Sequence, residues 1–375
     1  MNQPEKLNRY LIALLQVPGI GVSTARHLVR MVGHEHVASI FSLPPSKLAS
    51  IDGIGEVRAR NILKFDDWKA VDDILKKTEA VGAQLVSYRD EDYPAMLRQT
   101  YDAPLLLWVL GDRSALNKPA IAVVGTRSPS RYGAKQASEW TEKLIHAGLA
   151  VNSGLAYGVD AIAHRTTVEE GGCTTAVLGS GVDWIYPDKN RAIAKRMIDS
   201  GGAVITEYPP GTKPDAGNFP ERNRIVSGMS YGTLVIESGR KGGSMITARL
   251  ALDQNRDVFV VPHALDSAKG EGNNWLIKRG LGKLVQTVED VLDELPVDAQ
   301  PTDGKREEGR HYQQIANELS EEQQRLCGWL QENELHIDEL CARAGEPTHK
   351  LLPALLELEM IGVVRQKAGK YFELC

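Results

Sequence analysis

The alternation of apolar and polar positions divides the chain into three regions. Between residues 104 and 285, short and strongly apolar runs alternate with stretches of helical periodicity, such as residues 133–146 and 159–170. Strands this apolar, separated by helices, indicate a parallel sheet that helices cover on both faces. We therefore predict a doubly wound, Rossmann-like α/β domain over residues 81–295. Its expected strands are residues 85–88, 105–110, 121–124, 149–151, 175–178, 203–206, 233–236 and 258–261.

The first 80 residues contain an internal repeat. Val17-Pro-Gly-Ile-Gly21 and Ile51-Asp-Gly-Ile-Gly55 each precede a helical pattern, which is typical of a helix-hairpin-helix unit. In such a unit the Gly-x-Gly turn exposes backbone N–H groups at a helix start, where they bind a DNA phosphate without reading sequence. The alternative interpretation is a plain helical hairpin whose glycines only permit a tight turn. Residues 1–80 are predicted to form an all-α head.

The last region follows a polar stretch with two prolines, residues 296–311, which is typical of a flexible linker. Residues 312–375 have the pattern of a winged helix, with helices expected over 321–331 and 348–358 and a hairpin after Ile361. Such domains often bind duplex DNA through the second helix of a helix-turn-helix. Here that helix carries Glu357 and Glu359 besides Lys350, so protein docking or dimerisation is an equal alternative.

Small-residue turns follow several of the predicted strands. Gly125-Thr-Arg127, Ser153-Gly154, Gly179-Ser-Gly181 and the stretch from Glu237 to Ser244 each come directly after an apolar run. In an open α/β sheet such turns gather along the carboxyl edge of the strands, where ligands bind. We therefore predict an anion-binding crest on this edge.

Arg222-Asn223-Arg224 lies near an expected helix start within the same region. Arginine suits bidentate contacts with phosphate, so this group and Arg127 favour a phosphate-bearing ligand. The alternative interpretation is a buried ion-pair network with one of three glutamates, Glu207, Glu221 or Glu237.

Catalytic motifs are weaker. Neither the Gly-x-x-x-x-Gly-Lys-[Ser/Thr] P-loop nor the Gly-x-Gly-x-x-Gly dinucleotide fingerprint occurs, so we expect no nucleotide cofactor. Asp160 and His164 share a helix face beside the Ser153 turn, and with Glu237 they suit a hydrolase. The alternative is that Asp160 ties the Ser153 loop and that His164 is a packing residue.

Composition limits the remaining possibilities. The formal net charge of −5 excludes a protein coated in positive charge, so any nucleic-acid contact must come from a local patch. The four cysteines lack Cys-x-x-Cys pairing and zinc-finger spacing, so we expect neither a metal site nor a disulfide framework. No apolar run reaches the roughly 18 residues of a membrane span, and no secretion signal is evident, so we expect no membrane partner and a cytoplasmic location.

Six motifs run in order through the predicted central domain: Ile121-Ala-Val-Val-Gly-Thr-Arg127, Asn152-Ser-Gly-Leu-Ala-Tyr-Gly-Val-Asp160, Val177-Leu-Gly-Ser-Gly-Val-Asp-Trp-Ile-Tyr-Pro187, Glu207-Tyr-Pro-Pro-Gly211, Asn218-Phe-Pro-Glu-Arg-Asn-Arg-Ile225 and Gly242-Gly-Ser-Met-Ile-Thr247. Together they resemble the DprA/Smf family of DNA-processing proteins. The flanking regions are similar to those of longer members, which have a helix-hairpin-helix or sterile-alpha-motif-like head and a winged-helix tail.

The resemblance implies a non-enzymatic recombination mediator that binds and protects single-stranded DNA during natural transformation. It also implies two protein partners, the RecA recombinase that is loaded onto the strand and a second copy of the chain in a homodimer. N–H groups and arginines would follow the DNA backbone without reading bases. Matched motif by motif, the expected DNA contacts are Arg127, Ser153, Gly154, Lys189, Arg222, Asn223, Arg224, Lys241, Gly242, Gly243, Ser244 and Thr247.

The sequence departs from the family pattern at four positions. Thr126 and Gly242 each replace a serine and are expected to be tolerated, because each keeps a small residue at its turn. Asp188 stands where some members have a basic residue, so the contact is expected from Lys189 beside it. His263 replaces a frequent glycine after Val-Pro, so we expect a different local loop there.

The alternative function comes from a related Rossmann-like fold. It is that of a nucleoside-monophosphate phosphoribohydrolase, which would use Glu237 beside the Gly242-Gly243 turn.

Overall fold

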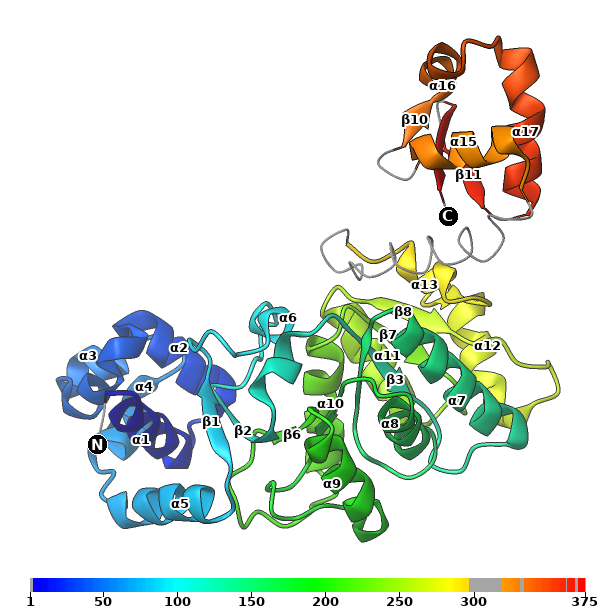
Figure 1. The fold of residues 1–375 in the computed structure, drawn as a ribbon. Helices are drawn as coiled ribbons and strands as arrows, with labels where there is room; N and C mark the ends of the chain where they lie inside the picture. The colour runs from blue at the N-terminus through cyan, green and yellow to red at the C-terminus, as the bar shows by residue number, and fades with distance from the viewer. Residues whose placement is uncertain (1–2, 297–318, 331–333, 362, 368–369, 375) are drawn as a thin grey trace. The chain divides into compact units, whose positions relative to one another are not determined.

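The computed structural model describes residues 3–296, 319–330, 334–361, 363–367 and 370–374 (Figure 1). The chain forms two compact units, Met1–Gln300 and Pro301–Cys375. Apart from Pro296, the predicted linker over 296–311 lies outside the described residues. None of the helices within the described ranges is long and apolar enough to cross a membrane.

The head of the first unit is all helical. Gly19 and Gly53 take positive φ angles of 83° and 74°, which a residue with a side chain rarely adopts, in the turns before the second and fourth α-helices. Leu11, Leu28 and Ile62 are fully or almost fully buried in a shared core. The elements are α1 (Gln3–Gln16), α2 (Val22–Val32), η1 (His34–Ser42), α3 (Pro45–Ala49), α4 (Gly55–Leu63) and α5 (Trp68–Ala80).

A nine-stranded sheet follows, in the order β1-β2-β6-β5-β4-β3-β7-β8-β9. Every predicted strand is present within two residues, and β9 is an addition that the apolar pattern does not predict. The strands are β1 (Gln84–Ser87), β2 (Leu106–Gly111), β3 (Ala120–Val124), β4 (Ala150–Ser153), β5 (Thr174–Val177), β6 (Ala203–Thr206), β7 (Gly232–Val235), β8 (Asp257–Val260) and β9 (Lys283–Leu284).

The sheet is mostly, not wholly, parallel. β3 to β9 run parallel to one another, whereas β2 is antiparallel to both of its neighbours, β1 and β6. The β1–β2 pair is antiparallel because its connection has no crossover: the N–H of Tyr88 donates to the carbonyl of Leu105 at 2.9 Å, so the segment between them closes a long hairpin. The predicted doubly wound α/β domain is confirmed, with this antiparallel edge as a correction.

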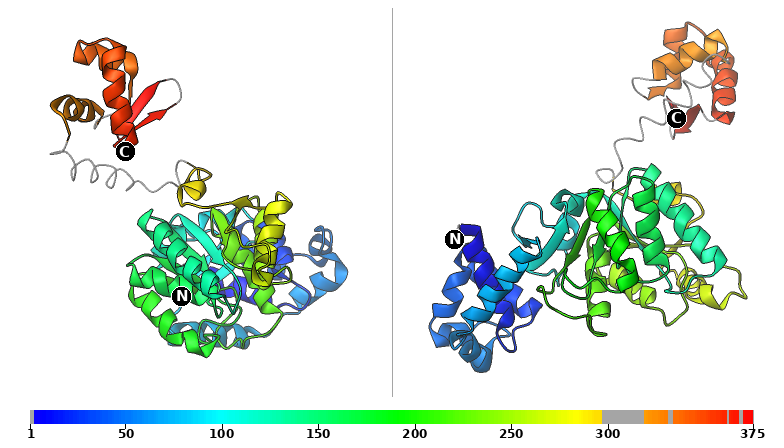
Figure 2. Two further views of the ribbon diagram at one scale, coloured as in Figure 1. Left: turned by 90° about the vertical axis from the view of Figure 1, so that its right-hand side faces the viewer. Right: turned by 60° about the horizontal axis from the view of Figure 1, so that its bottom comes forward.

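Helices cover both faces of the sheet (Figures 1 and 2). One face carries α7 (Arg131–His146), α8 (Val159–Glu169), α9 (Arg191–Asp199) and α13 (Glu289–Leu292). The other carries α6 (Ala95–Arg98), α10 (Asn218–Gly228), α11 (Gly243–Asp253) and α12 (Glu271–Lys278). The short 3-10 helices are η2 (Arg113–Asn117), η3 (Asp188–Asn190) and η4 (Ala268–Gly270).

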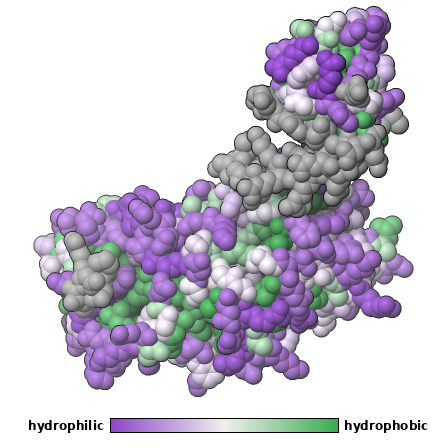
Figure 3. All heavy atoms as spheres, viewed as in Figure 1, coloured by the Kyte–Doolittle hydropathy of each residue, from purple (hydrophilic) through white to green (hydrophobic). Residues whose placement is uncertain are grey.

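The head packs directly on the antiparallel edge of the sheet. Trp108 of β2 is 2% exposed within the core of the head, and its indole N–H donates to the hydroxyl of Thr78 at 2.9 Å. Head and sheet therefore share buried side chains within one unit. Hydrophilic residues cover most of the visible face of this unit, with smaller apolar areas between them (Figure 3).

The second unit is the predicted winged helix. Its three-stranded antiparallel sheet has the order β10-β12-β11, and Leu340, Leu355 and Phe372 are fully buried in its core. Lys350 on the second helix of the helix-turn-helix pairs with Glu346 at 2.9 Å, which offsets its charge. The elements are α15 (Glu321–Leu330), β10 (Leu335–His336), α16 (Ile337–Ala344), α17 (Thr348–Met360), β11 (Val364–Lys367) and β12 (Tyr371–Leu374).

Candidate functional site

A cavity of about 770 Å³ lies where the carboxyl ends of β3, β4 and β7 meet the first turns of α8, α10 and α11. This is the edge at which open α/β sheets bind ligands. The structure brings most of the predicted DNA contacts into its wall: Arg127, Gly154, Arg222, Asn223, Gly242, Gly243, Ser244 and Thr247. The other four, Ser153, Lys189, Arg224 and Lys241, do not line it.

Arg222 is the buried centre of this wall. Arg222 is 5% exposed, and its guanidinium donates to the carbonyl of Gly154 at 2.6 Å and to the carbonyl of Val177, so it joins the ends of β4 and β5. Burial lowers the pKa of Arg222 to about 10, and the nearby Asp160 carboxylate opposes that shift. Arg222 therefore holds the cavity wall together while adding positive charge to it.

Arg224 does not line the cavity and instead forms ion pairs with two carboxylates. Its side chain is 13% exposed and forms two hydrogen bonds with the Glu207 carboxylate, at 2.7 and 2.6 Å, and its Nε lies 3.3 Å from Asp102. The ion pair with Glu207 that the sequence left open as an alternative is present. Its DNA contact stays a prediction, and the two carboxylates offset its charge in this structure.

Arg127 is the exposed cation of the cavity. Its guanidinium lies 6.0 Å from the centre of the Phe219 ring, and that ring lies 5.5 Å from the ring of Tyr186. Within the described residues no carboxylate pairs with Arg127. Sequence reasoning did not include Phe219 and Tyr186 among the contacts, although an aromatic residue beside the arginine motif is the signal that indicates base stacking.

The first turn of α11 supplies backbone donors. Its N-cap, Gly242, has no side chain to accept from the helix N–H groups, and a Cβ at Gly243 would meet nothing within 4 Å. The Ser244 hydroxyl donates to the Ser238 hydroxyl at 2.7 Å, which fixes the preceding turn. The N–H groups of this turn, at the positive end of the helix dipole, therefore suit a phosphate oxygen.

The other three predicted contacts, Ser153, Lys189 and Lys241, lie outside the cavity wall. Ser153 is fully buried, and its hydroxyl donates to the carbonyl of Val123 at 2.7 Å. Lys189 and Lys241 are exposed outside the cavity wall. Asp188, beside Lys189, accepts two hydrogen bonds from Arg191 at 3.0 and 2.8 Å, so the Arg191 guanidinium offsets the negative charge of Asp188.

Glu237 supports the site from behind. Its carboxylate is fully buried and accepts from the N–H and the hydroxyl of Ser130, at 2.7 and 2.6 Å, at the start of α7. His263, the departure from the family pattern, donates from Nε2 to the carbonyl of Ile236 at 2.8 Å and lies 3.9 Å from Glu237. Glu237 does not line the cavity, so it serves as scaffold for two adjoining turns.

Asp160 and His164 form no catalytic pair. The Asp160 carboxylate accepts from the N–H groups of Gly154 and Ala156, at 3.2 and 3.3 Å, as the tying role predicts. Burial raises the pKa of the Asp160 carboxyl. His164 is fully buried, its Nδ1 lies 2.7 Å from the Thr174 hydroxyl, and burial lowers its pKa to about 3.

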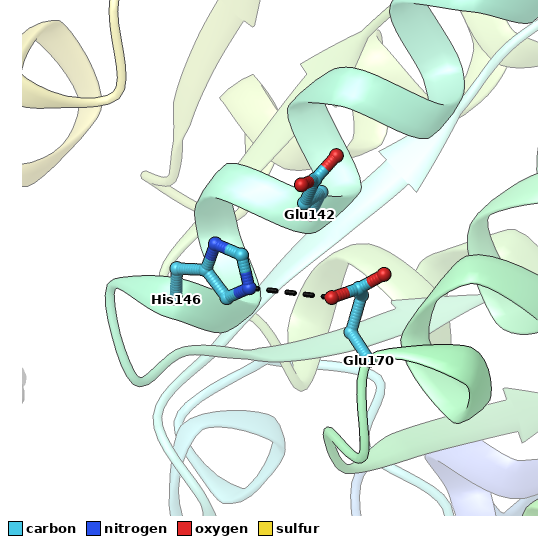
Figure 4. A group of neighbouring side chains, drawn as sticks. All are labelled: Glu142, His146 and Glu170. Carbon is cyan, nitrogen blue, oxygen red and sulfur yellow. Dashed lines mark hydrogen bonds and ion pairs between the residues drawn. The ribbon is translucent and has the colours of Figure 1, made fainter.

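A separate cluster of possible metal ligands lies at the end of α7 (Figure 4). Glu142, His146 and Glu170 bring their ligand atoms within 4.8 Å of one another, and His146 Nε2 lies 3.3 Å from Glu170. All three side chains are at the surface. A surface ion pair is sufficient to explain the arrangement.

Comparison with family models assigns all three regions. Residues 84–296 match the model of DNA recombination-mediator protein A, residues 311–370 match the DprA winged helix domain, and residues 11–65 match a SAM-like helix-hairpin-helix tandem. The predicted head, central domain and tail are therefore recognised in the same order.

Individual proteins agree with this assignment. Protein Smf of Escherichia coli is 35% identical over 327 residues, covering 84% of this chain and 84% of that protein. The structure of DNA processing protein A from Streptococcus pneumoniae has a TM-score of 0.66 and 33% identity, covering 77% of this chain and 98% of that one. The Helicobacter pylori protein, described for its single-stranded DNA binding mode, has a TM-score of 0.51 and 28% identity, covering 57% and 98%. The chain belongs to the DprA/Smf family of DNA-processing proteins.

Proposed function

We propose that the cavity at the carboxyl edge binds single-stranded DNA and that the protein acts as a recombination mediator. The observation that carries this proposal is the exposed guanidinium of Arg127, which no carboxylate of the described residues pairs with, near the ring of Phe219 and beside the open first turn of α11. A cation, backbone N–H groups and an aromatic pair are what a nucleic-acid strand needs for phosphate contact and base stacking. The relative from Helicobacter pylori, whose structure is described for single-stranded DNA binding, supports the ligand class.

The proposed contacts follow from the cavity wall. Arg127 and the α11 turn bind phosphates, Phe219 and Tyr186 stack on bases, and Arg222 with Gly154 keeps the wall in shape. Lys189 and Lys241, both exposed, extend the positive path beyond the cavity. Ser153 and Arg224 act indirectly, through the strand end and the buried ion pair.

A binding role fits better than a hydrolytic one. A phosphoribohydrolase would require the Glu237 carboxylate to reach the sugar, but that carboxylate is fully buried and accepts two hydrogen bonds from Ser130. We therefore propose a non-enzymatic protein. Incubation with nucleoside monophosphates, followed by chromatography for released base, is expected to give no product above a blank. Release that disappears in Glu237→Gln would establish the enzyme instead.

The proposed function is tested by a salt titration of binding to single-stranded and double-stranded oligonucleotides. The single strand is expected to bind more tightly, with an affinity that falls steeply as salt rises. Arg127→Ala is expected to weaken binding and to reduce the slope of log K against log salt by about 0.7, the value for one phosphate contact on a single strand.

Arg165→Ala is the matched control, because Arg165 is an exposed arginine on α8 that does not line the cavity. Its affinity and salt slope are expected to equal those of the unchanged protein. If both variants bind equally, or if Arg127→Ala leaves the slope unchanged, the cavity is not the binding site.

Two further parts of the proposal come from the family. We propose that the protein forms a homodimer and that it loads the RecA recombinase onto the bound strand. Light scattering after size exclusion measures the first, and a monomer mass would contradict it. The second predicts faster RecA filament formation on a strand pre-bound by this protein, and an equal rate for Arg127→Ala would contradict the link to this cavity.

A further inference from the structure

A second cavity, of about 550 Å³, lies between the head and the antiparallel edge of the sheet. Helix α2 forms one wall, and the hairpin that links β1 to β2, with α6 in it, forms the other. It shares no lining residue with the cavity at the carboxyl edge. Both walls belong to the same compact unit, so the cavity is part of one folded body.

Helix α2 turns a basic face toward this cavity. Ser23, Arg26, His27 and Arg30 recur at the three- and four-residue spacing of one helix face, and all four line the cavity. Ala25 and Leu28 lie on the opposite face and are fully buried in the head. The core therefore holds α2 in one orientation, and that orientation fixes where its arginines point.

Four arginines meet at this cavity, and no carboxylate in the described part of the chain offsets them. Arg26, Arg30, Arg89 and Arg98 all line it, and no aspartate or glutamate of the described ranges does so. None of the four forms an ion pair with a described residue. Asp90, next to Arg89, already accepts from the N–H and the hydroxyl of Ser87, each at 2.8 Å. Such an excess of positive charge favours an anion.

Two of the arginines are fixed in the walls. Arg26 donates to the carbonyl of Thr100 at 2.5 Å and to the Tyr88 hydroxyl at 3.0 Å, and it lies 4.7 Å from the centre of the Tyr88 ring. Arg98 donates to the carbonyl of Asp90 at 2.6 Å, while its buried Nε has no hydrogen-bond partner within the described ranges. Arg30 and Arg89 are exposed at the rim, and no hydrogen bond holds either side chain within the described part of the chain.

Two further groups point to a nucleotide rather than a simple ion. His34 lines the cavity, is only 7% exposed, and its Nε2 has no hydrogen-bond partner among the residues that the structure describes. A buried polar atom without a partner is costly unless a ligand satisfies it. Tyr101, also in the wall, is 75% exposed, so its ring is available for a base to stack on.

We propose that this cavity is a second binding site for single-stranded DNA, in which Arg30 and Arg89 contact phosphates and Tyr101 stacks on a base. The choice of DNA as the ligand rests on the proposed function. A strand held at two sites of one unit is bound more firmly than at either alone, because the second contact is intramolecular. The helix-hairpin-helix turns at Gly19 and Gly53 do not line this cavity.

The test is photochemical crosslinking of the full-length protein to an oligonucleotide that carries 4-thiothymine at many positions. Its length is about 30 nucleotides, enough to occupy both cavities. Mass spectrometry is expected to find a crosslinked peptide with Tyr101 and another with Phe219. Arg30→Ala/Arg89→Ala is expected to lower the Tyr101 crosslink about tenfold or more, the effect of losing two charge-assisted contacts. At oligonucleotide concentrations that saturate the cavity at the carboxyl edge, the Phe219 crosslink is expected to stay unchanged.

Arg165→Ala/Arg279→Ala is the matched control, because it removes the same charge from exposed arginines outside both cavities. Both crosslinks are expected to persist in it. No Tyr101 crosslink in the unchanged protein, or an undiminished one in Arg30→Ala/Arg89→Ala, overturns the second site. If thymidine monophosphate at equal phosphate concentration suppresses the Tyr101 crosslink as well as an unlabelled oligonucleotide does, the site takes free nucleotides and the strand assignment is overturned.

Failure of this inference is distinct from failure of the proposed function. If only the second site is absent, the Phe219 crosslink is still found in the unchanged protein, and Arg127→Ala still lowers it. A carboxyl-edge site that is absent removes the Phe219 crosslink itself.

Discussion

The guanidinium of Arg222 packs against Gly154 so closely that a Cβ at that glycine would overlap it. Gly154→Ala must therefore displace Arg222 from the carbonyls of Gly154 and Val177. Because Arg222 is buried, its lost hydrogen bonds and the overpacking are expected to lower the free energy of unfolding by about 2–4 kcal/mol. Denaturant unfolding measures this change, and the affinity for single-stranded DNA is expected to fall with it.

Gly243→Ala is the control for that substitution. A Cβ at Gly243 meets nothing within 4 Å, and the residue starts α11, where alanine is well tolerated. Its free energy of unfolding is expected to stay within about 0.5 kcal/mol of the unchanged protein. Equal stability of the two variants would mean that Arg222 is not locked against Gly154.

The buried pair of Arg224 and Glu207 gives a second prediction. Arg224→Ala leaves the Glu207 carboxylate, only 7% exposed, without its two hydrogen bonds. Loss of one partner from a buried pair is expected to cost about 3–5 kcal/mol of unfolding free energy. Thermal or denaturant unfolding measures it. Arg224→Ala/Glu207→Gln is expected to recover part of the loss, because the more buried of the two carboxylate charges is removed and only that of Asp102 stays without its partner.

The same pair of variants separates two roles of Arg224. If Arg224 only supports the fold, the double variant regains affinity for single-stranded DNA along with stability. If Arg224 contacts phosphate, as the family motif implies, affinity stays low although stability recovers. A single variant as stable as the unchanged protein would contradict the buried ion pair.

Much of the site could be predicted because it follows from local pattern. The apolar runs place every strand of this sheet except β9, and the small-residue turns after β3, β4 and β7 then meet at one edge by the geometry of a parallel sheet. This is why Arg127, Gly154 and Gly243 could be grouped from sequence alone. The antiparallel edge could not, because apolar runs carry no strand direction.

The sequence could not decide which partner each side chain has. Arg222 and Arg224 are two residues apart, yet one joins strand ends while the other pairs with Glu207, because α10 turns them to different sides. Likewise the spacing of Arg26 and Arg30 on α2 indicates a basic face, but only the fold shows that Arg89 and Arg98 lie across from it.

The buried His164 makes stability depend on pH. Burial lowers its pKa to about 3 from the ordinary 6.5, so near pH 5 the unfolded chain binds a proton that the folded protein does not. Its contribution to stability is thus complete above pH 6.5 and is lost as pH falls toward 3. Between pH 7 and pH 5 the expected loss is about 2 kcal/mol of unfolding free energy, measured in denaturant at each pH.

His164→Asn removes this slope, because asparagine does not titrate and keeps a donor near Thr174. The unfolding free energy of the variant is expected to be lower at pH 7, but it should lack the loss of about 2 kcal/mol between pH 7 and pH 5 that His164 causes. His146→Asn, which removes an exposed histidine, is the control and should retain the slope. A slope that survives in His164→Asn would assign it to another group.

Phe219 tests base stacking apart from charge. Its ring lies near both Tyr186 and Arg127 and lines the cavity, so Phe219→Leu keeps an apolar side chain but removes the stacking surface. One lost base–aromatic contact costs about 1–3 kcal/mol, an expected fall in affinity for single-stranded DNA of about 5- to 150-fold. Fluorescence anisotropy with a labelled oligothymidylate measures it, and the salt slope should not change, because no phosphate contact is lost.

Phe219→Trp and Tyr132→Leu complete the comparison. Tryptophan restores a stacking surface, so its affinity should lie close to that of the unchanged protein. Tyr132 is an exposed aromatic outside the cavity wall, and its loss should leave binding intact. If Phe219→Leu binds as tightly as Tyr132→Leu, the aromatic pair is not a stacking platform and the cavity holds DNA by phosphate contacts alone. If Phe219→Leu instead lowers the salt slope, the ring acts by positioning Arg127, since only a lost phosphate contact changes that slope.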